Sequence, residues 1–370
     1  MTTELKEVSF SLLKKLCEKV GPSGFEDEVR NIVVNEIEQY VDKLWIDAMG
    51  NVIGLKKGEG GGKVMIAAHI DEIGLMINAI TSDGFLRFVP IGGWNERIVP
   101  GQRVLIRTLD GKIFRGVIGV KPPHIMKPEE AQKVLALSEL FIDVGASSKD
   151  EVEKMGITIG SVAVFDRTVE RLANPNVVTG KSFDDRAGVV AMILAARMLA
   201  NTKTDVDVYF VATVQEEVGL KGARTAAFSI APDFGIAIDV TIAADVPGVA
   251  EHERFTYLGK GPAVKIMDGR AGSGVIVSPA VVKLITEAAK EEGIPYQIEV
   301  LSGGTTDASA MQIAREGIPV GVISVPTRYI HSAVEVLHLD DLVNTARLVA
   351  ATIKKVNRKW IEENLRRIIK

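Results

Sequence analysis

The chain has 370 residues, 46% hydrophobic and 25% charged, and its 44 basic and 48 acidic side chains give a formal net charge of −4. This composition excludes a disordered chain, and no apolar run reaches the roughly 18 residues that a membrane-spanning helix needs. The negative charge argues against nucleic acid as a partner. Cys17 is the only cysteine, so neither an intramolecular disulfide nor a thiolate zinc cluster is expected. Because the N-terminus lacks a signal-peptide pattern, we expect a cytoplasmic protein.

The first half of the chain begins helical and then becomes rich in β-structure. Apolar residues at helical spacing predict two amphipathic helices between Ser9 and Tyr40, separated by a break at Gly21–Gly24. Two strands follow around the turn at Gly50–Asn51, and residues 64–68 predict a buried strand. From about Ile73 to Arg171, short alternating apolar segments separated by glycines and prolines predict a small β-barrel or sandwich.

The second half of the chain alternates long helices with buried strands, which is typical of an α/β layer fold. A compact domain does not carry a structureless loop of about 100 residues. We therefore predict one discontinuous α/β catalytic domain, residues 1–71 and 173–370, with a β-rich domain inserted at residues 72–172. Within the second half we predict helices at 185–199, 278–291 and 339–356, and strands at 206–214, 235–240 and 320–325.

Histidine and acidic side chains follow the most apolar of these predicted strands. The ligand crevice of an open α/β sheet lies outside the carboxyl ends of its strands, so we expect these side chains to converge. Asp184, at the start of a predicted helix directly after the insertion, is expected to join them. The strand-end residues are His69 and Asp71, then Glu216 and Glu217, then Asp239, and finally His331.

Such a set of side chains indicates a metal site. Two imidazoles with several carboxylates form a nitrogen and oxygen donor set that suits Zn²⁺, Co²⁺ or Mn²⁺. Without a cation, so many neighbouring carboxylates would repel one another. Two metals would need a bridging carboxylate to activate water, and one further carboxylate must remain free as a general base. Glu216 and Glu217 are well placed to divide these tasks, because neighbouring side chains at a strand end point in different directions.

Several segments together carry a resemblance to a known family: 69–74, 183–186, 214–219, 237–240 and 328–332. In this order they resemble the metal-site motifs of the M42 family of metallo-aminopeptidases, the TET-type tetrahedral peptidases. The resemblance extends over essentially the whole chain, including Pro122-Pro123-His124 and the segment 303–307. Thr305 stands where the family commonly has a third glycine, which bears on substrate preference.

The resemblance implies a role for each of these side chains. His69 and Asp239 would bind one metal, Glu217 and His331 the other, and Asp184 would bridge both. Glu216 would be the general base, and Asp71 would fix the tautomer and basicity of His69. These are therefore the expected catalytic residues, Glu216 and Asp71, and the expected metal ligands, His69, Asp184, Glu217, Asp239 and His331.

The resemblance also implies the architecture and the activity. We expect a metallo-exopeptidase-like α/β/α catalytic domain with an inserted PDZ-like β-barrel that mediates dimerisation, and a cis peptide between Asp184 and Asp185. The dimers would assemble into a tetrahedral dodecamer with inward-facing sites. Each subunit would hold two divalent ions, Zn²⁺ or Co²⁺, and would hydrolyse peptides with a free N-terminus.

Two other functions remain open at this stage. A glycoside hydrolase would use Glu216 and a second carboxylate as an acid and base pair, but it would leave His69 and His331 without a role. A non-catalytic peptide-binding shell is the other alternative.

Five further residues receive separate interpretations. Asp185 is expected to serve the amino end of its helix rather than a metal. His124 is interpreted as a turn or interface histidine, and His252 and His338 as solvated or capping residues. Asp307 or a carboxylate of the metal cluster is expected to bind the α-ammonium group of the substrate.

Overall fold

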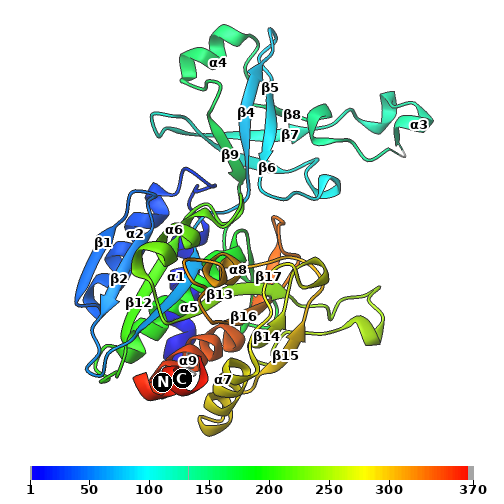
Figure 1. Ribbon diagram of the computed structural model, residues 1–370. Coiled ribbons are helices and arrows are strands. Elements are labelled where there is room, and N and C mark those ends of the chain that lie inside the picture. The colour runs from blue at the N-terminus through cyan, green and yellow to red at the C-terminus, as the bar shows by residue number, and fades with distance from the viewer. Residues whose placement is uncertain (1, 132, 366–370) are drawn as a thin grey trace.

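The longest apolar segments of the sequence form the centre of a mixed sheet in the computed structural model, which describes residues 2–131 and 133–365 (Figure 1). Four neighbouring strands run parallel in the order β12-β3-β13-β16. Nearly all of their side chains are buried. Burial on both faces explains why each strand is a continuous apolar run. Their bounds are Lys63–His69 for β3, Asp207–Thr213 for β12, Phe234–Ile242 for β13 and Val320–Arg328 for β16.

Further strands extend this sheet on both sides, giving the order β1-β2-β12-β3-β13-β16-β17-β11-β10, with β14 pairing with β16 and β15 with β14. Strand β17 is antiparallel to both β16 and β11, so its amino end lies beside their carboxyl ends. The bounds are β1 Lys43–Ile46, β2 Val52–Lys56, β10 Glu170–Arg171, β11 Val177–Gly180, β14 Ala263–Met267, β15 Gln297–Val300 and β17 Glu335–His338.

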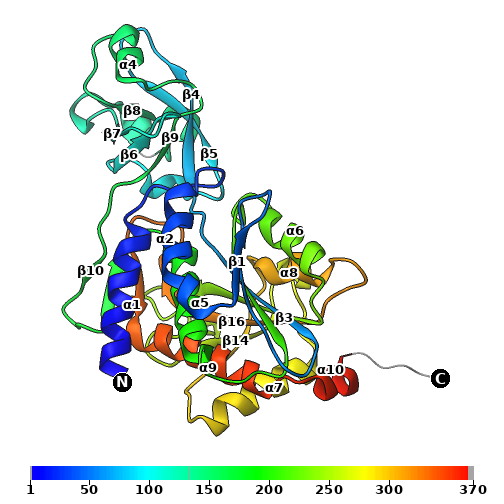
Figure 2. The ribbon, with the colours of Figure 1, turned by 90° about the vertical axis from the view of Figure 1, so that its left-hand side faces the viewer.

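Helices cover both faces of the sheet, as expected for an α/β/α layer fold (Figure 2). On one face, α5 packs on β3 and β13 and contacts α1, α2 and α9, while α7 contacts α9 and β16. On the other face, α6 and α8 pack on each other and against β12, β3 and β13. The bounds are α1 Thr2–Cys17, α2 Asp27–Ile37, α5 Phe183–Leu199, α6 Lys221–Ile230, α7 Pro279–Glu291, α8 Asp307–Gln312, α9 Leu339–Lys355 and α10 Arg358–Asn364.

The predicted insertion contains a closed barrel of six antiparallel strands in the order β4-β5-β8-β7-β6-β9, which confirms the predicted β-barrel (Figure 1). The barrel has a hydrophobic core of its own, separate from that of the α/β domain. Strand β10 lies within the predicted insertion but pairs with β11 of the large sheet, and the boundaries 72 and 172 stay predictions. The barrel strands are β4 Gly74–Ile80, β5 Leu86–Ile91, β6 Arg103–Arg107, β7 Ile113–Gly119, β8 Phe141–Asp143 and β9 Val162–Phe165, accompanied by α3 Pro128–Ala131 and α4 Lys149–Met155.

The predicted elements of the α/β domain agree with the observed ones to within a few residues, except that the first helix begins at Thr2 rather than near Ser9. Helices α6 and α8 and strands β14, β15 and β17 were not predicted. Among the described residues, no helix combines the length and apolarity needed to cross a membrane.

Candidate metal centre

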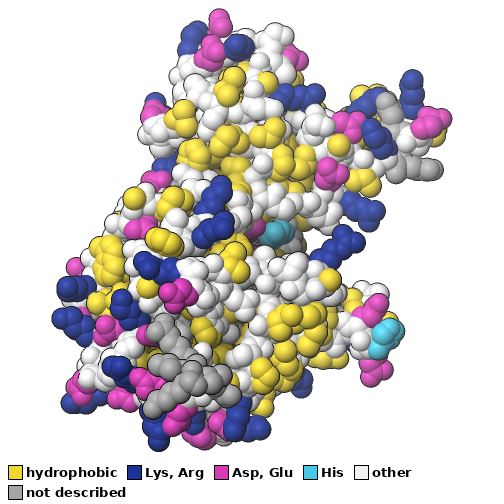
Figure 3. Space-filling model, viewed as in Figure 1, with side chains coloured by type: hydrophobic (Ala, Val, Ile, Leu, Met, Phe, Trp, Pro, Cys, Tyr) yellow, Lys and Arg dark blue, Asp and Glu magenta, His cyan; other side chains and the backbone are white. Residues whose placement is uncertain are grey.

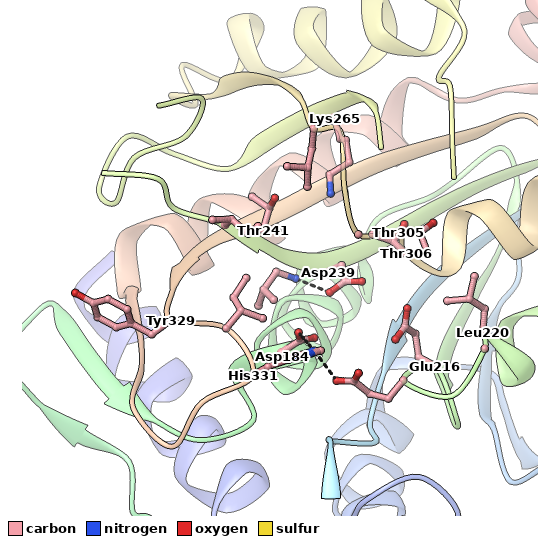
Figure 4. A pocket seen from close by; sticks show the side chains of 17 residues that line it. Asp184, Glu216, Leu220, Asp239, Thr241, Lys265, Thr305, Thr306, Tyr329 and His331 are labelled. Carbon is pink, nitrogen blue, oxygen red and sulfur yellow. Dashed lines mark hydrogen bonds and ion pairs between the residues drawn. The ribbon is translucent and has the colours of Figure 1, made fainter. Parts of the chain in front are cut away.

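The four parallel strands bring the predicted strand-end residues to one edge of the sheet. Figure 4 shows Glu216, Asp239 and His331 around the same pocket. His69 is the last residue of β3, Glu216 and Glu217 follow β12, and His331 follows β16. Asp239 differs from its predicted place at a strand end, because β13 continues for three residues beyond it. Glu216, Glu217, Asp239 and His331 nevertheless line one cavity, since neighbouring parallel strands end at the same edge. His69 is buried beside it.

Asp184, at the start of α5, lies between the two histidines. Its Oδ1 is 3.1 Å from His69 Nε2, and its Oδ2 is 3.2 Å from His331 Nε2. Glu217 Oε1 is 3.2 Å from His331 Nε2, and Asp239 Oδ1 is 4.0 Å from His69 Nε2. The peptide between Asp184 and Asp185 is cis. Two histidine-carboxylate groups therefore share one carboxylate.

Asp185 also lies close to His69 and Asp239, and these three side chains form a group that could hold a metal ion. Both of its oxygens already accept backbone hydrogen bonds, from His69 N at 3.2 Å and from Gly188 N at 3.0 Å. This arrangement agrees with a role at the amino end of α5 rather than at a metal.

Asp71 is fully buried and holds the segment that follows β12. Its Oδ1 accepts a hydrogen bond from Glu216 N at 3.0 Å and its Oδ2 one from Glu217 N at 3.2 Å. Ser23 Oγ also donates to Asp71 Oδ2, at 2.6 Å. His69 Nδ1 lies 3.1 Å from the backbone oxygen of Asp71 and 3.5 Å from its Oδ1. With either contact, His69 Nε2 remains directed at Asp184. The Asp71 carboxylate also orients Glu216 and Glu217, a function that was not predicted from the sequence.

The electrostatics of this cluster favour cations. Burial raises the pKa of Glu216 and of Asp239 well above the usual range, and nearby carboxylates raise both further, while His69 acts in the opposite direction. Burial opposes the charged form of His331, yet Asp184 and Glu217 raise its pKa to about 12. Glu217 Oε1 is buried without an aligned hydrogen-bond donor. A buried excess of carboxylates beside two imidazoles fits one or two divalent cations of the Zn²⁺ or Co²⁺ type.

A buried ion cluster beside the site was not predicted from the sequence. Glu72 accepts hydrogen bonds from Lys181 Nζ at 2.8 and 2.9 Å and from Arg186 Nη2 at 3.0 Å. Arg186 also donates to the backbone oxygen of Ile70. The cluster ties the segment after His69 to the segment around Asp184. Only the tertiary structure reveals it, because its members come from two separate parts of the chain, residues 70–72 and 181–186.

Replacing Lys181 by Met is expected to lower the free energy of unfolding by about 3 kcal/mol, because it leaves the buried Glu72 with one cationic partner fewer. Chemical denaturation of the protein measures the effect. Lys203→Met is the matched control, since Lys203 forms a 2.9 Å ion pair with Glu59 on the surface and should not shift the unfolding midpoint. Equal midpoints for native protein and Lys181→Met would contradict this role for the cluster.

A cavity of about 740 Å³ opens beside the metal-ligand candidates (Figure 4). Its wall contains Asp184, Glu216, Glu217, Asp239 and His331 together with apolar side chains such as Leu220 and Ile330. Figure 3 shows a histidine beside an acidic side chain in the hollow between the barrel and the α/β domain. The cavity therefore gives a ligand direct access to the cluster.

The residues around this cavity differ in part from expectation. Asp307 is buried, accepts a hydrogen bond from Thr213 Oγ1 at 2.5 Å and does not belong to the cavity wall, which argues against it as the site for an α-ammonium group. Lys265, which was not predicted as a site residue, also lines the cavity. Its Nζ lies 3.7 Å from Glu299 Oε2 and 3.9 Å from Asp268 Oδ2.

The three other histidines have no donor role in this cluster. His124 and His252 are exposed on short turns. His338 precedes α9, and its Nδ1 accepts a hydrogen bond from Asp340 N at 3.2 Å, as expected of a capping residue.

Comparison with known proteins shows extensive similarity. The family model described as M42 glutamyl aminopeptidase matches residues 50–348. The lysyl aminopeptidase of Pyrococcus furiosus is 40% identical over 352 residues, covering 94% of this chain and 98% of the relative. The solved structure of an aminopeptidase from the archaeon Desulfurococcus kamchatkensis is 56% identical, covers 99% of each chain and has a TM-score of 0.95.

Two further solved structures bear on assembly and on the alternative activity. The TET1 peptidase of Pyrococcus horikoshii, described as assembling into a tetrahedron or a large octahedral shell, is 38% identical with a TM-score of 0.83 and covers 94% of this chain and 100% of its own. A Thermotoga maritima structure titled endoglucanase is 32% identical with a TM-score of 0.75 and covers 94% of this chain and 97% of its own.

The α/β fold with its inserted barrel and these matches define the class of protein: the chain is an aminopeptidase, a hydrolase that acts on N-terminal residues. Within that class it belongs to the M42 family.

Proposed function

We propose that the chain is a dinuclear metal-dependent aminopeptidase. His69 and Asp239 would hold one divalent ion, Glu217 and His331 the other, and Asp184 both. The observation that carries the proposal is the position of Asp184, whose two oxygens face His69 and His331 at 3.1 and 3.2 Å. When bound, two divalent cations polarise the scissile carbonyl, lower the pKa of water and oppose the negative charge that develops on the carbonyl oxygen.

Glu216 is proposed as the general base. Its carboxylate lines the cavity, its Oε2 lies 3.7 Å from His69 Nε2, and Asp71 holds its backbone amide. Glu216 would accept a proton from the attacking water while the water oxygen bonds to the carbonyl carbon, and would deliver that proton to the leaving amine as the carbon-nitrogen bond breaks. Burial raises the pKa of Glu216 above the usual range of a carboxyl group, and a pKa perturbed in this way is typical of catalytic acids and bases.

The α-ammonium group of the substrate is proposed to bind a carboxylate of the cluster at the cavity wall. The test compares aminoacyl-p-nitroanilides with the same compounds acetylated at the α-nitrogen. Acetylation should lower kcat/KM by at least about 100-fold, because it removes the positive charge that one buried carboxylate would pair with. Equal rates on both series would contradict an exopeptidase that recognises the free N-terminus.

A homo-oligomeric assembly is also proposed, with the barrel contributing to the contacts between subunits. Hydrophobic side chains gather on the face of the barrel (Figure 3), and Leu109, Ile125 and Ile159 are each about two-thirds exposed. Exposed apolar surface of this kind marks protein interfaces. The dimeric and tetrahedral dodecameric states, the choice of Zn²⁺ or Co²⁺ and the cytoplasmic location remain proposals.

A further inference from the structure

Glu335, the first residue of β17, is buried and accepts hydrogen bonds from three backbone amides. Its Oε2 accepts from Phe183 N at 2.5 Å and from Asp184 N at 3.3 Å, and its Oε1 accepts from His331 N at 2.9 Å. One carboxylate therefore holds the backbones of two segments that carry metal-ligand candidates.

The sheet topology makes this contact possible. Strand β17 lies between β16 and β11 and is antiparallel to both. His331 follows β16 and Asp184 follows β11, so the amino end of β17 lies where the two segments meet. In the ladder, Glu335 pairs with Gly180 at the end of β11.

The segment after β16 also needs to be held in place. Tyr329 has φ 59° and His331 has φ 60°, so both occupy the left-handed region that residues with a Cβ rarely adopt. A backbone in this region persists where its surroundings over-determine it. The hydrogen bond from His331 N to Glu335 is one such restraint.

We propose that Glu335 is a positioning residue that fixes the spacing between Asp184 and His331, and thereby the second metal subsite. The inference deepens the proposed function and rests on it. Glu335 would not bind the metal itself, because both of its oxygens accept hydrogen bonds from backbone amides. A carboxylate suits the position because both of its oxygens accept hydrogen bonds. A glutamine offers one acceptor, and its NH₂ group would face a backbone N–H at one of the two segments.

The test is Glu335→Gln with two readouts that do not depend on activity. Chelator competition measures metal affinity, which should fall about tenfold at one of the two sites, as for other groups that orient metal ligands from behind. The melting temperature is measured with and without metal. The increase that metal binding causes should be smaller in Glu335→Gln than in the native protein.

Asp341→Asn provides the matched control. Asp341 is also buried and accepts from two backbone amides, Gly259 N at 2.6 Å and Gly261 N at 2.7 Å, but it contacts no ligand segment. This variant should lower the melting temperature with and without metal equally and retain native metal affinity.

Three outcomes separate the possibilities. Glu335→Gln with native metal affinity and equal losses of melting temperature in both states would make Glu335 merely structural and overturn the inference. Native protein that binds no divalent metal would instead defeat the proposed function. If Glu335→Gln does not fold, Glu335→Asp, which keeps both oxygens but is one methylene shorter, is measured against the same criteria.

Discussion

Glu216→Gln is expected to lower kcat on aminoacyl-p-nitroanilides by about 10² to 10⁴-fold, the usual contribution of a general base. The amide cannot accept the proton of the attacking water. Metal content should remain that of the native protein, because Glu216 is the one glutamate of the Glu216-Glu217 pair that the proposal leaves off the metals. Steady-state kinetics and metal analysis of the purified variant measure both quantities.

Glu26→Gln is the control for this experiment. Glu26 is a buried glutamate that accepts a hydrogen bond from Gly24 N at 2.7 Å, but it does not line the cavity. Its variant should keep kcat within about threefold of native. Full activity in Glu216→Gln, or loss of metal together with activity, would assign Glu216 a different role.

Removal of divalent metal is expected to abolish peptidase activity, and re-addition of Zn²⁺ or Co²⁺ should restore it. Without cations, the carboxylates of Asp184, Glu217 and Asp239 lie close together beside His69 and His331, and neighbouring carboxylates repel one another. The metal-free protein should therefore also melt at a lower temperature. Binding at about 1,000 times Kd contributes about 4 kcal/mol to the folded state. Dialysis against a chelator, metal analysis, activity assay and thermal melts test this prediction.

The same experiment distinguishes the glycoside hydrolase. An acid and base pair of carboxylates needs no metal, so polysaccharide hydrolysis should persist in chelator if that function were correct. The structural neighbour titled endoglucanase makes carboxymethylcellulose the appropriate substrate. Unchanged cleavage of aminoacyl-p-nitroanilides by protein verified to be metal-free would refute the dinuclear mechanism, and cellulose hydrolysis under those conditions would favour the alternative.

The alternation of helices and strands was predictable because burial on both faces of the sheet demands continuous apolar runs, as in β3 and β16. The barrel was predictable from alternating segments and turn residues. Helix α8 was not predictable, because an element of six residues is too short to show a clear hydrophobic periodicity. Asp239 was placed at a strand end, whereas β13 continues past it, since polar residues in a fully paired central strand do not reveal where the strand stops.

The sequence by itself determined the donor chemistry, because the types of side chain and their positions after apolar strands are local properties. It thereby indicated the cluster of histidines and carboxylates, and the resemblance to the M42 family implied which of them would be ligands: His69, Asp184, Glu217, Asp239 and His331. Only the tertiary structure decided how these groups are held. Asp71 beneath Glu216, Lys181 and Arg186 around Glu72, and Glu335 between two ligand segments are contacts across large distances in sequence. Strand order and register create such contacts, and no local pattern encodes them.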